Sequence, residues 1–263
     1  MTRYTTPFDL VEGDATMGLV LAADHAGRAV PEEYGSLGLP SAEFERHIAY
    51  DIGVEGLTRR LAELTGAPAV MANFSRLLID PNRGEDDPTL IRQLYDGTVI
   101  AGNYPLGEAE RQRRLDTYFT PYHDAVAGLI EKVATASKAA PFIFSVHSFT
   151  PHLGARPRPW QVGILWDSDP RAPLPLIDML AQEPGMIVGD NEPYDGCLKG
   201  DTMYKHAIIP GYAHVLIEVR QDLIADAAGI EEWAQRLAPM ILRLNAMPGM
   251  HEVRHYGSRA DLE

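Results

Sequence analysis

The chain has 263 residues and a formal net charge of −14, with apolar residues at 45% and charged residues at 23%. These proportions are typical of a soluble globular protein, and the length suits one large α/β domain over residues 1–263. The acidic charge argues against a nucleic-acid-binding protein, because no basic cluster exceeds RQRR at 111–114. No apolar run approaches the roughly 18 residues of a membrane span.

The N-terminus and the cysteine content both indicate a cytoplasmic protein. The first 14 residues contain acids and a proline where a signal peptide would have an apolar core. The chain has one cysteine, Cys197, which can form neither an intramolecular disulfide nor a thiolate cage for a metal ion.

Predicted strands and helices alternate along the chain. In chain order they are strand 17–23, helix 41–65, strand 68–74, helix 107–137, strands 141–147 and 161–166, helix 173–183, strands 185–190 and 214–220, and helix 229–246. Ser41 is the expected N-cap of the first helix, and Pro121 is expected to kink or split the second. This order predicts a mostly parallel sheet with helices on both faces, in which ligands bind beyond the carboxyl ends of the strands.

Three polar residues lie where predicted strands end. Strand 17–23 runs into His25, strand 141–147 ends at His147, and Glu218 lies in the strand VLIEVR. A single histidine after a strand is more often a hydrogen-bonded core residue, and Glu218 alone could face solvent on an edge strand. Because all three fall at one edge of the sheet, they are candidates for a catalytic Zn²⁺ site with one position open for water.

The predicted helix 41–65 offers a third metal ligand. Projected at about 100° per residue, His47 and Asp51 fall within its apolar arc, one turn apart. A buried carboxylate is costly unless it is paired or binds a metal, so Asp51 is the candidate. The alternatives are that Asp51 caps a nearby loop or pairs with an arginine.

A predicted tight turn at Asp80–Asn82 carries an arginine on each side, Arg76 and Arg83. A guanidinium group can bind a carboxylate through two parallel hydrogen bonds, which makes these arginines and Asn82 candidate substrate contacts. The alternative is that the arginines pair with the four acids between positions 80 and 87, above all in the case of Arg76.

Three further residues are candidate substrate contacts because they lie near the same strand ends. Ser148 begins the irregular polar stretch that follows strand 141–147, and stretches of this length often carry function. Arg220 comes two residues after Glu218. His206 lies in the polar segment KHAI, where a substrate contact, a general acid and a solvated histidine are all possible.

Six sequence blocks carry a resemblance to a known family. DHAGRAVP, HIAYDIGVEGL, SRLLIDPNR, VHSFTP, DNEPY and IEVRQDLI occur in this order across nearly the whole chain and resemble the N-formylglutamate amidohydrolase family. That family is similar to the zinc carboxypeptidase and aspartoacylase group. The resemblance implies a phosphorylase/hydrolase-like, three-layer α/β sandwich with a mixed central sheet, and one Zn²⁺ per chain.

The resemblance also implies roles for individual residues. It makes His25 the first zinc ligand and His147 the last, and it makes Glu218 the base that activates the attacking water. The pair Asn82 and Arg83 matches an asparagine–arginine pair that grips a substrate carboxylate.

One position departs from the carboxypeptidase-like pattern. That pattern has a glutamate ligand three residues after the first histidine, where this chain has Arg28. Asp51 takes the place of this ligand on the helix argument given above.

The expected function is zinc-dependent hydrolysis of the amide of an N-formyl or short N-acyl amino acid, such as N-formylglutamate. One alternative is a metal-dependent hydrolase of a different amide or peptide. Another is a small-molecule binding protein without enzymatic activity, which the departure at Arg28 keeps open. The metal content of protein purified without chelator separates the last alternative from the other two.

Overall fold

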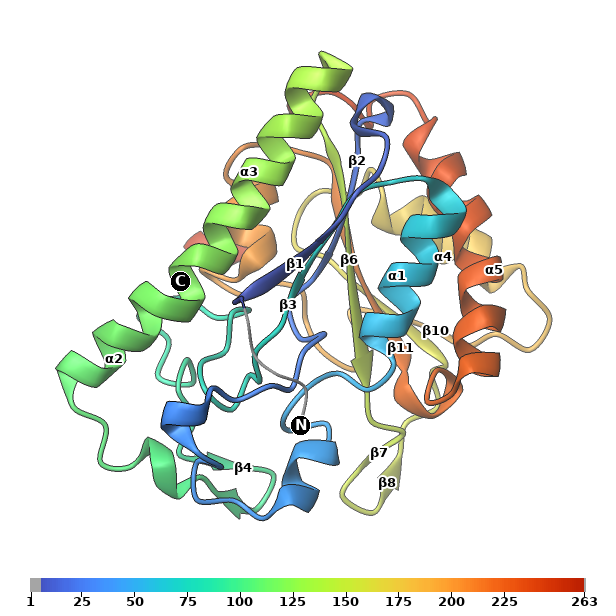
Figure 1. Cartoon of the computed structure of the whole chain (residues 1–263). Coiled ribbons are helices and arrows are strands. Elements are labelled where there is room, and N and C mark those ends of the chain that lie inside the picture. The colour runs from blue at the N-terminus through green and yellow to red at the C-terminus, as the bar shows by residue number, and fades with distance from the viewer. Residues whose placement is uncertain (1–5, 263) are drawn as a thin grey trace.

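A seven-stranded mixed sheet separates two layers of helices in the computed structural model, which describes residues 6–262 (Figure 1). The strand order is β1-β3-β2-β6-β11-β9-β10. These strands are β1 Phe8–Val11, β2 Leu19–Ala23, β3 Ala69–Ala72, β6 Phe142–Phe149, β9 Val162–Leu165, β10 Val188–Asp190 and β11 His214–Arg220. Two small hairpins pair β4 Leu94–Tyr95 with β5 Thr98–Val99, and β7 His152–Leu153 with β8 Arg156–Pro157.

The central strands of the sheet run parallel. β2 pairs in parallel with β3 and β6, β6 with β11, and β9 with β10, whereas β1 runs antiparallel to β3 and β9 antiparallel to β11. The predicted three-layer α/β sandwich with a mostly parallel, mixed sheet is confirmed. Because β2, β6 and β11 point the same way, their carboxyl ends meet at the lower edge of the sheet in Figure 1.

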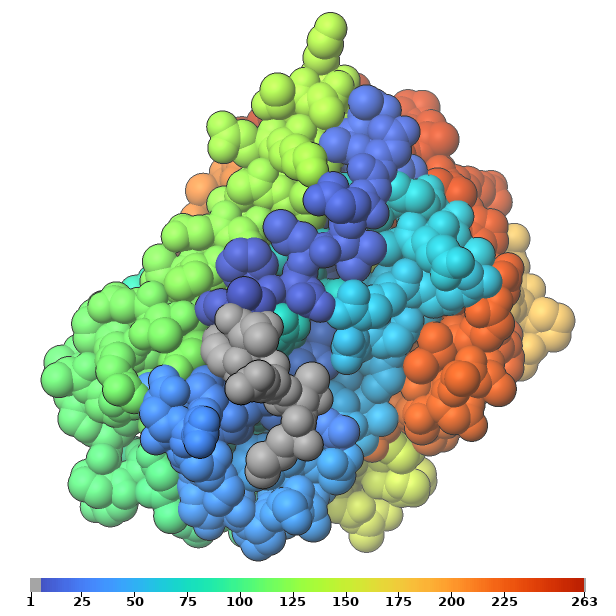
Figure 2. All heavy atoms as spheres, in the orientation of Figure 1, coloured from blue at the N-terminus to red at the C-terminus, as the bar shows by residue number. Residues whose placement is uncertain are grey.

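Helices cover both faces of this sheet. They are α1 Val54–Thr65, α2 Glu108–Arg114, α3 Thr120–Ser137, α4 Pro173–Ala181 and α5 Ala227–Asn245. α2 and α3 lie on one side, and α1, α4 and α5 lie on the other (Figure 1). In the space-filling view, α3 in green and α5 in orange form the two flanks, and the lighter blue segment between β2 and α1 fills the lower part of this face (Figure 2).

Each face of the sheet has its own hydrophobic cluster, and β11 shows why. Val215, Ile217 and Val219 pack in the cluster with α1, α4 and α5, whereas Leu216 packs in the cluster with α3. Successive side chains of a strand point to opposite faces. Glu218 therefore points to the same face as Leu216, towards α3.

The predicted helix 41–65 is wrong in its first half. Residues Ser41–Glu45 form a 3₁₀ turn, and the α-helix begins only at Val54. The preceding Gly53 has φ 84°, a left-handed conformation in which the α-helix cannot continue. A Cβ at Gly53 would also meet the carbonyl oxygen of Ile224 at 2.1 Å, so close packing against that loop fixes the break.

The predicted helix 107–137 is interrupted before Pro121. α2 ends at Arg114, a π-helical turn spans Leu115–Phe119, and α3 begins at Thr120. Proline lacks the backbone N–H that an α-helical hydrogen bond needs. The wider turn accommodates this missing donor, and the helix then resumes along the same flank (Figure 1).

Two further differences concern strands. The prediction omits β1, a short edge strand whose residues are mostly half-buried and give no clear alternation. β6 extends to Phe149, two residues beyond the predicted end, because its pairing with β11 continues to Arg220. His147 and Ser148 therefore lie within the strand. Among residues 6–262, no helix is both long and apolar enough to cross a membrane.

A loop crosses closely over β9 and β10 at two glycines. A Cβ at Gly163 would meet the carbonyl oxygen of Glu192 at 2.1 Å, and a Cβ at Gly189 would meet the same oxygen at 2.5 Å. The loop after β10 can therefore lie directly on the backbone of both strands. It continues into the segment around Tyr194, which borders the site described next.

Candidate active site

His147 and Glu218 are neighbours at the carboxyl edge of the sheet. Their Cα atoms are direct partners in the parallel pairing of β6 with β11. Both side chains are buried, at 2% and 7% exposure. β11 is a central strand with β6 on one side and β9 on the other, so the possibility that Glu218 faces solvent on an edge strand is wrong.

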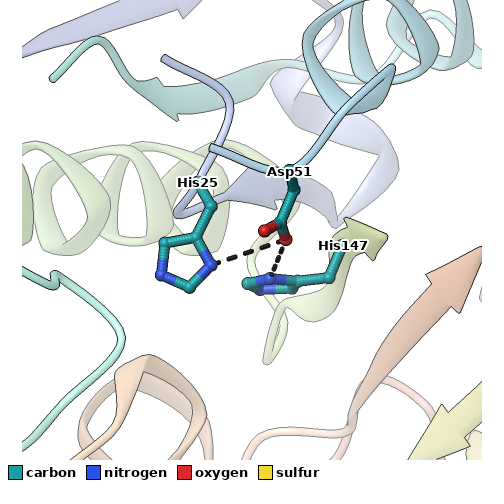
Figure 3. Close-up of side chains that lie close together, drawn as sticks. All are labelled: His25, Asp51 and His147. Carbon is teal, nitrogen blue, oxygen red and sulfur yellow. Dashed lines mark hydrogen bonds and ion pairs between the residues drawn. The ribbon is translucent and has the colours of Figure 1, made fainter. Parts of the chain in front are cut away.

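His25, Asp51 and His147 form a buried group that we call the His–Asp–His cluster (Figure 3). One carboxylate oxygen of Asp51, Oδ2, lies 3.0 Å from Nδ1 of His147 and 3.5 Å from Nδ1 of His25. One ligand atom from each residue lies within 4.8 Å of the others. Two imidazole nitrogens and a carboxylate oxygen thus converge on one point.

The far side of each imidazole ring is held by another carboxylate. Nε2 of His25 lies 2.7 Å from Asp80, and Nε2 of His147 lies 3.1 Å from Asp24. Asp24 also accepts hydrogen bonds from the hydroxyl groups of Tyr122 and Thr202. With Nε2 of each ring donating to these carboxylates, the lone pair of each Nδ1 would be free for a ligand at the point of convergence.

This donor set fits a metal ion. Nδ1 of His25 is buried and has no hydrogen-bond partner within the described part of the chain. A buried, unpaired ring nitrogen is costly unless a ligand completes it. Histidine ligands whose second nitrogen donates to a carboxylate are the usual arrangement in zinc sites, and His₂-carboxylate sets occur in catalytic ones.

Asp51 reaches the cluster from a loop and not from a helix. Its backbone N–H donates to the carbonyl oxygen of His25 at 2.9 Å, which joins the loop before α1 to the segment that follows β2. The helix argument for Asp51 is therefore wrong, although Asp51 does lie beside both histidines. His47, from the same argument, is partly exposed and lies 3.6 Å from Asp96.

Arg76 is buried between two carboxylates. It donates to Asp80 at 2.8 and 3.2 Å and to Asp51 at 3.3 Å. The alternative that Arg76 pairs with neighbouring acids is therefore the arrangement found. Its contacts hold one cluster residue, Asp51, and one residue that orients the cluster, Asp80.

Among the acids described for this site, Glu218 is the one with a buried carboxyl oxygen that accepts no hydrogen bond. Its Oε2 is buried without a hydrogen-bond partner in the described residues, and burial raises the pKa of Glu218 to about 8. The nearby charges of His147, Arg76 and Arg158 act in the opposite direction but do not outweigh burial. A carboxyl group with a pKa near neutrality can both accept and return a proton.

A cavity of about 700 Å³ opens over these residues. The His–Asp–His cluster and Glu218 line it, and its walls come from residues 76–96, 147–158 and 194–201. A cavity of this size suits a small-molecule ligand. The first wall is rich in arginine, and the second and third contribute Phe149 and Tyr194, whose rings flank the guanidinium group of Arg158.

The remaining predicted substrate contacts separate into two groups. Asn82, Arg83 and Ser148 line the cavity. His206 does not line it, and its Nε2 instead lies 2.9 Å from Nδ1 of His123. Arg220 also lies outside the lining, and it pairs with Asp222 at 2.8 Å.

Arg28, at the position of the expected glutamate ligand, lies away from the cluster. Its guanidinium group pairs with Glu45 and lies over the ring of Tyr50. The carboxylate that the cluster needs comes from Asp51 instead.

Comparisons with known proteins place the chain in a family. The family model described as N-formylglutamate amidohydrolase matches residues 17–225, a range that includes the His–Asp–His cluster and Glu218. The chain belongs to the N-formylglutamate amidohydrolase family. The resemblance in the six sequence blocks is confirmed, and the protein is a hydrolase.

Two solved structures share the fold of this amidohydrolase. The Agrobacterium tumefaciens gene product Atu2144 is 30% identical, with a TM-score of 0.84 over 91% of this chain and 95% of that one. N-formylglutamate amidohydrolase from Ralstonia eutropha JMP134 is 22% identical, with a TM-score of 0.65 over 92% of this chain and 97% of that one. A comparison of the sequence with curated proteins found no match.

Several cavity residues of this amidohydrolase escaped the sequence analysis. Arg92, Tyr95 and Asp201 come from loops or a short hairpin and follow no buried strand, so no pattern pointed to them. Asp80 was predicted as a turn residue and, in the alternative for Arg76, as one of its possible acidic partners, but not as a partner of His25. Its spacing from Arg76, four residues along the chain, is the one signal of their pairing.

Asp201 should make the stability of the amidohydrolase depend on pH. Burial raises the pKa of Asp201 to about 7, although the backbone N–H of Tyr204 donates to it. The folded state thus holds this proton more tightly than the unfolded state, and stability falls as pH rises from about 4 to 7. Asp201→Asn should therefore be more stable than wild type at pH 8, by on the order of a few kcal/mol, with a smaller gain at pH 5.

Urea unfolding at the two pH values measures this difference. Asp178→Asn, at an exposed position of α4, is the matched control and should change neither curve. An equal gain for Asp201→Asn at both pH values would contradict the assignment of the effect to this carboxyl group.

Proposed function

We propose that this amidohydrolase uses one Zn²⁺ per chain to hydrolyse the amide of N-formyl or other short N-acyl amino acids. One observation carries the proposal. Two Nδ1 atoms and the Oδ2 of Asp51 converge on one point, and the buried carboxyl group of Glu218 lines the same cavity.

His25, Asp51 and His147 would hold the ion through these three atoms. A zinc ion bound there would lower the pKa of a water molecule and stabilise negative charge on the substrate oxygen. Asp24 and Asp80 keep the imidazole rings in the orientation that this binding needs.

Glu218 is the general base in this proposal. Its carboxylate accepts a proton from the attacking water as the water oxygen bonds to the acyl carbon. The amide C–N bond then breaks, and Glu218 returns the proton to the leaving nitrogen. The products are the free amino acid and, for a formyl substrate, formate. The raised pKa of Glu218 suits both proton transfers.

Asn82 and Arg83 would bind the α-carboxylate of the substrate. Arg83 lines the cavity, and its closest carboxylate partner, Asp87, lies 4.0 Å away at the limit of an ion pair. Its hydrogen bonds go to neutral groups, the hydroxyl of Thr89 and the carbonyl of Asn82. The charge of Arg83 therefore remains available for an anionic ligand.

A substrate panel with metal control tests this function. We expect N-formyl amino acids to be hydrolysed by protein containing about one zinc per chain, with activity lost after chelation and restored by added Zn²⁺. N-acetyl analogues and short peptides in the same panel separate the two hydrolase alternatives. Binding of these compounds without turnover, by protein with far less than one zinc per chain, would favour the non-enzymatic alternative.

A further inference from the structure

The third wall of the cavity, residues 194–201, is a loop that forms no helix or strand. Its backbone is held near its start, where the N–H of Gly196 donates to the side chain of Asn191 at 3.1 Å. The side chain of Asp195 binds outside this loop, to the stretch of residues 246–262 that follows α5 and that we call the C-terminal segment. This segment lies beyond the residues that match the family model, so family membership alone gives it no role.

Arg259 of the C-terminal segment joins the third wall to the end of β9. Its two terminal nitrogens contact the two carboxylate oxygens of Asp195 at 2.6 and 3.1 Å, a fork that fixes the orientation of the carboxylate as well as its position. The same guanidinium group donates to the carbonyl oxygens of Trp166 and Asp167, at 3.0 and 3.2 Å, directly after β9. One side chain thus connects a loop of the cavity to the sheet.

The residues around Arg259 are anchored by Asp167. Its side chain is buried and accepts hydrogen bonds from the hydroxyl of Ser258 and, at 2.9 Å, from the backbone N–H of Arg259. Earlier in the C-terminal segment, the carbonyl oxygen of Gly249 accepts a hydrogen bond from Arg171 at 2.9 Å. Arg259 therefore extends towards the wall from a backbone that is already fixed to the loop after β9.

A second contact between the C-terminal segment and the wall lies four residues further along the wall. Asp261 is 3.0 Å from Nζ of Lys199 and accepts a hydrogen bond from the hydroxyl of Tyr204 at 2.8 Å. Like the pair of Asp195, this pair is exposed, so each contributes little free energy alone. Together the two pairs hold the wall on either side of Cys197, whose N–H donates to Asp195 at 2.9 Å.

We propose that Arg259 is a positioning residue for substrate binding, which acts by holding Asp195 and the third wall in place. Arg259 itself does not line the cavity, whereas Asp195 does. The adjacent ring of Tyr194 lies 5.0 Å from the guanidinium group of Arg158 on the second wall, so a shift of Asp195 also disturbs the contact between two walls. Glu218 lies on β11, outside this loop, so the effect falls on binding and not on the chemical step. The inference rests on the proposed function for its substrate, whereas the contacts of Arg259 do not depend on it.

Steady-state kinetics with N-formyl-L-glutamate test the effect on binding. Arg259→Gln should raise KM by about threefold to fivefold and change kcat by less than about twofold, because the change removes an exposed contact that shapes the cavity. Asp195→Asn should raise KM by a similar factor. The double variant should be no worse than either single variant, because both changes break the same contact. Arg259→Lys should recover only part of the loss, since an ammonium group cannot make the two-point contact.

Hydrogen exchange of the wall tests the same contact without any substrate. The amides of Gly196 and Cys197 should exchange at least about threefold faster in Arg259→Gln than in wild type, because the wall opens more often. Arg254→Gln is the matched control, since Arg254 is an exposed arginine of the same segment that pairs with Glu252 within that segment. It should change neither KM nor the exchange of the wall.

An unchanged KM or an unchanged exchange rate in Arg259→Gln would overturn the inference, as would additive losses in the double variant. A double variant that regains the wild-type KM would also overturn it, because Arg259 would then only neutralise the charge of Asp195. If wild type hydrolyses no N-formyl amino acid, the proposed function is wrong and the exchange measurement decides by itself. Faster exchange in Arg259→Gln would then support the role of Arg259 in holding the wall, and unchanged exchange would refute it.

Discussion

Glu218→Gln should retain zinc and fold but lose between about 10² and 10⁴ in kcat, the usual contribution of a positioned general base. The amide has nearly the shape of the carboxyl group but cannot accept a proton at neutral pH. Because burial raises the pKa of Glu218 to about 8, the neutral glutamine should not destabilise the folded state. Loss of activity without loss of stability is thus the expected signature.

The measurement combines kcat at saturating substrate, zinc content and a thermal unfolding curve. Glu131→Gln, on the exposed side of α3, is the matched control. A Glu218→Gln variant that keeps more than about a tenth of the wild-type kcat would exclude Glu218 as the general base.

His25→Ala and His147→Ala should each reduce zinc from about one per chain to a small fraction and abolish turnover, because a site with three protein ligands cannot spare one. Each change also leaves a buried carboxylate, Asp80 or Asp24, without its imidazole partner. The variants should therefore unfold more easily, by about 1–3 kcal/mol. Zinc must accordingly be measured in the folded, soluble fraction.

Two comparison variants make this result specific. His255→Ala, on the exposed C-terminal segment, should retain zinc. Asp80→Ala removes a group that orients His25 but not a ligand, so it should weaken zinc binding by about 10- to 100-fold without abolishing it. Stoichiometric zinc in folded His25→Ala or His147→Ala would place the metal site elsewhere.

The strands were predictable from sequence because they are buried on both faces. Each of the predicted strand segments overlaps one of the observed strands β2, β3, β6, β9, β10 and β11, with ends shifted by a few residues. Continuous apolar runs such as the one around Leu21 have no other stable location in a protein of this size. The positions of His25, His147 and Glu218 at one sheet edge followed from this parallel order.

The loops were not predictable because distant backbone contacts set their course. Asp51 lies at the cluster through a backbone hydrogen bond with His25, and its expected helix begins only three residues later. Arg92 is placed by the amide of Asn103, and Asp201 by a loop that also contacts the Asn82 turn. The residues next to these positions in the sequence do not indicate which distant backbone or side chain they will contact.

The close approach of the loop to Gly163 and Gly189 bears on how this enzyme can diversify. The loop over these glycines leads into Tyr194 and the third wall of the cavity, whereas His147 lies on β6, Glu218 on β11, and His25 and Asp51 on other loops. A methyl group at either glycine would meet the carbonyl of Glu192 and displace the loop, which would reshape that wall, but Gly163 is also the strand partner of Glu218, whereas Gly189 lies on the edge strand β10. A change in substrate range is therefore accessible through Gly189, a position that carries no side chain and does not line the cavity.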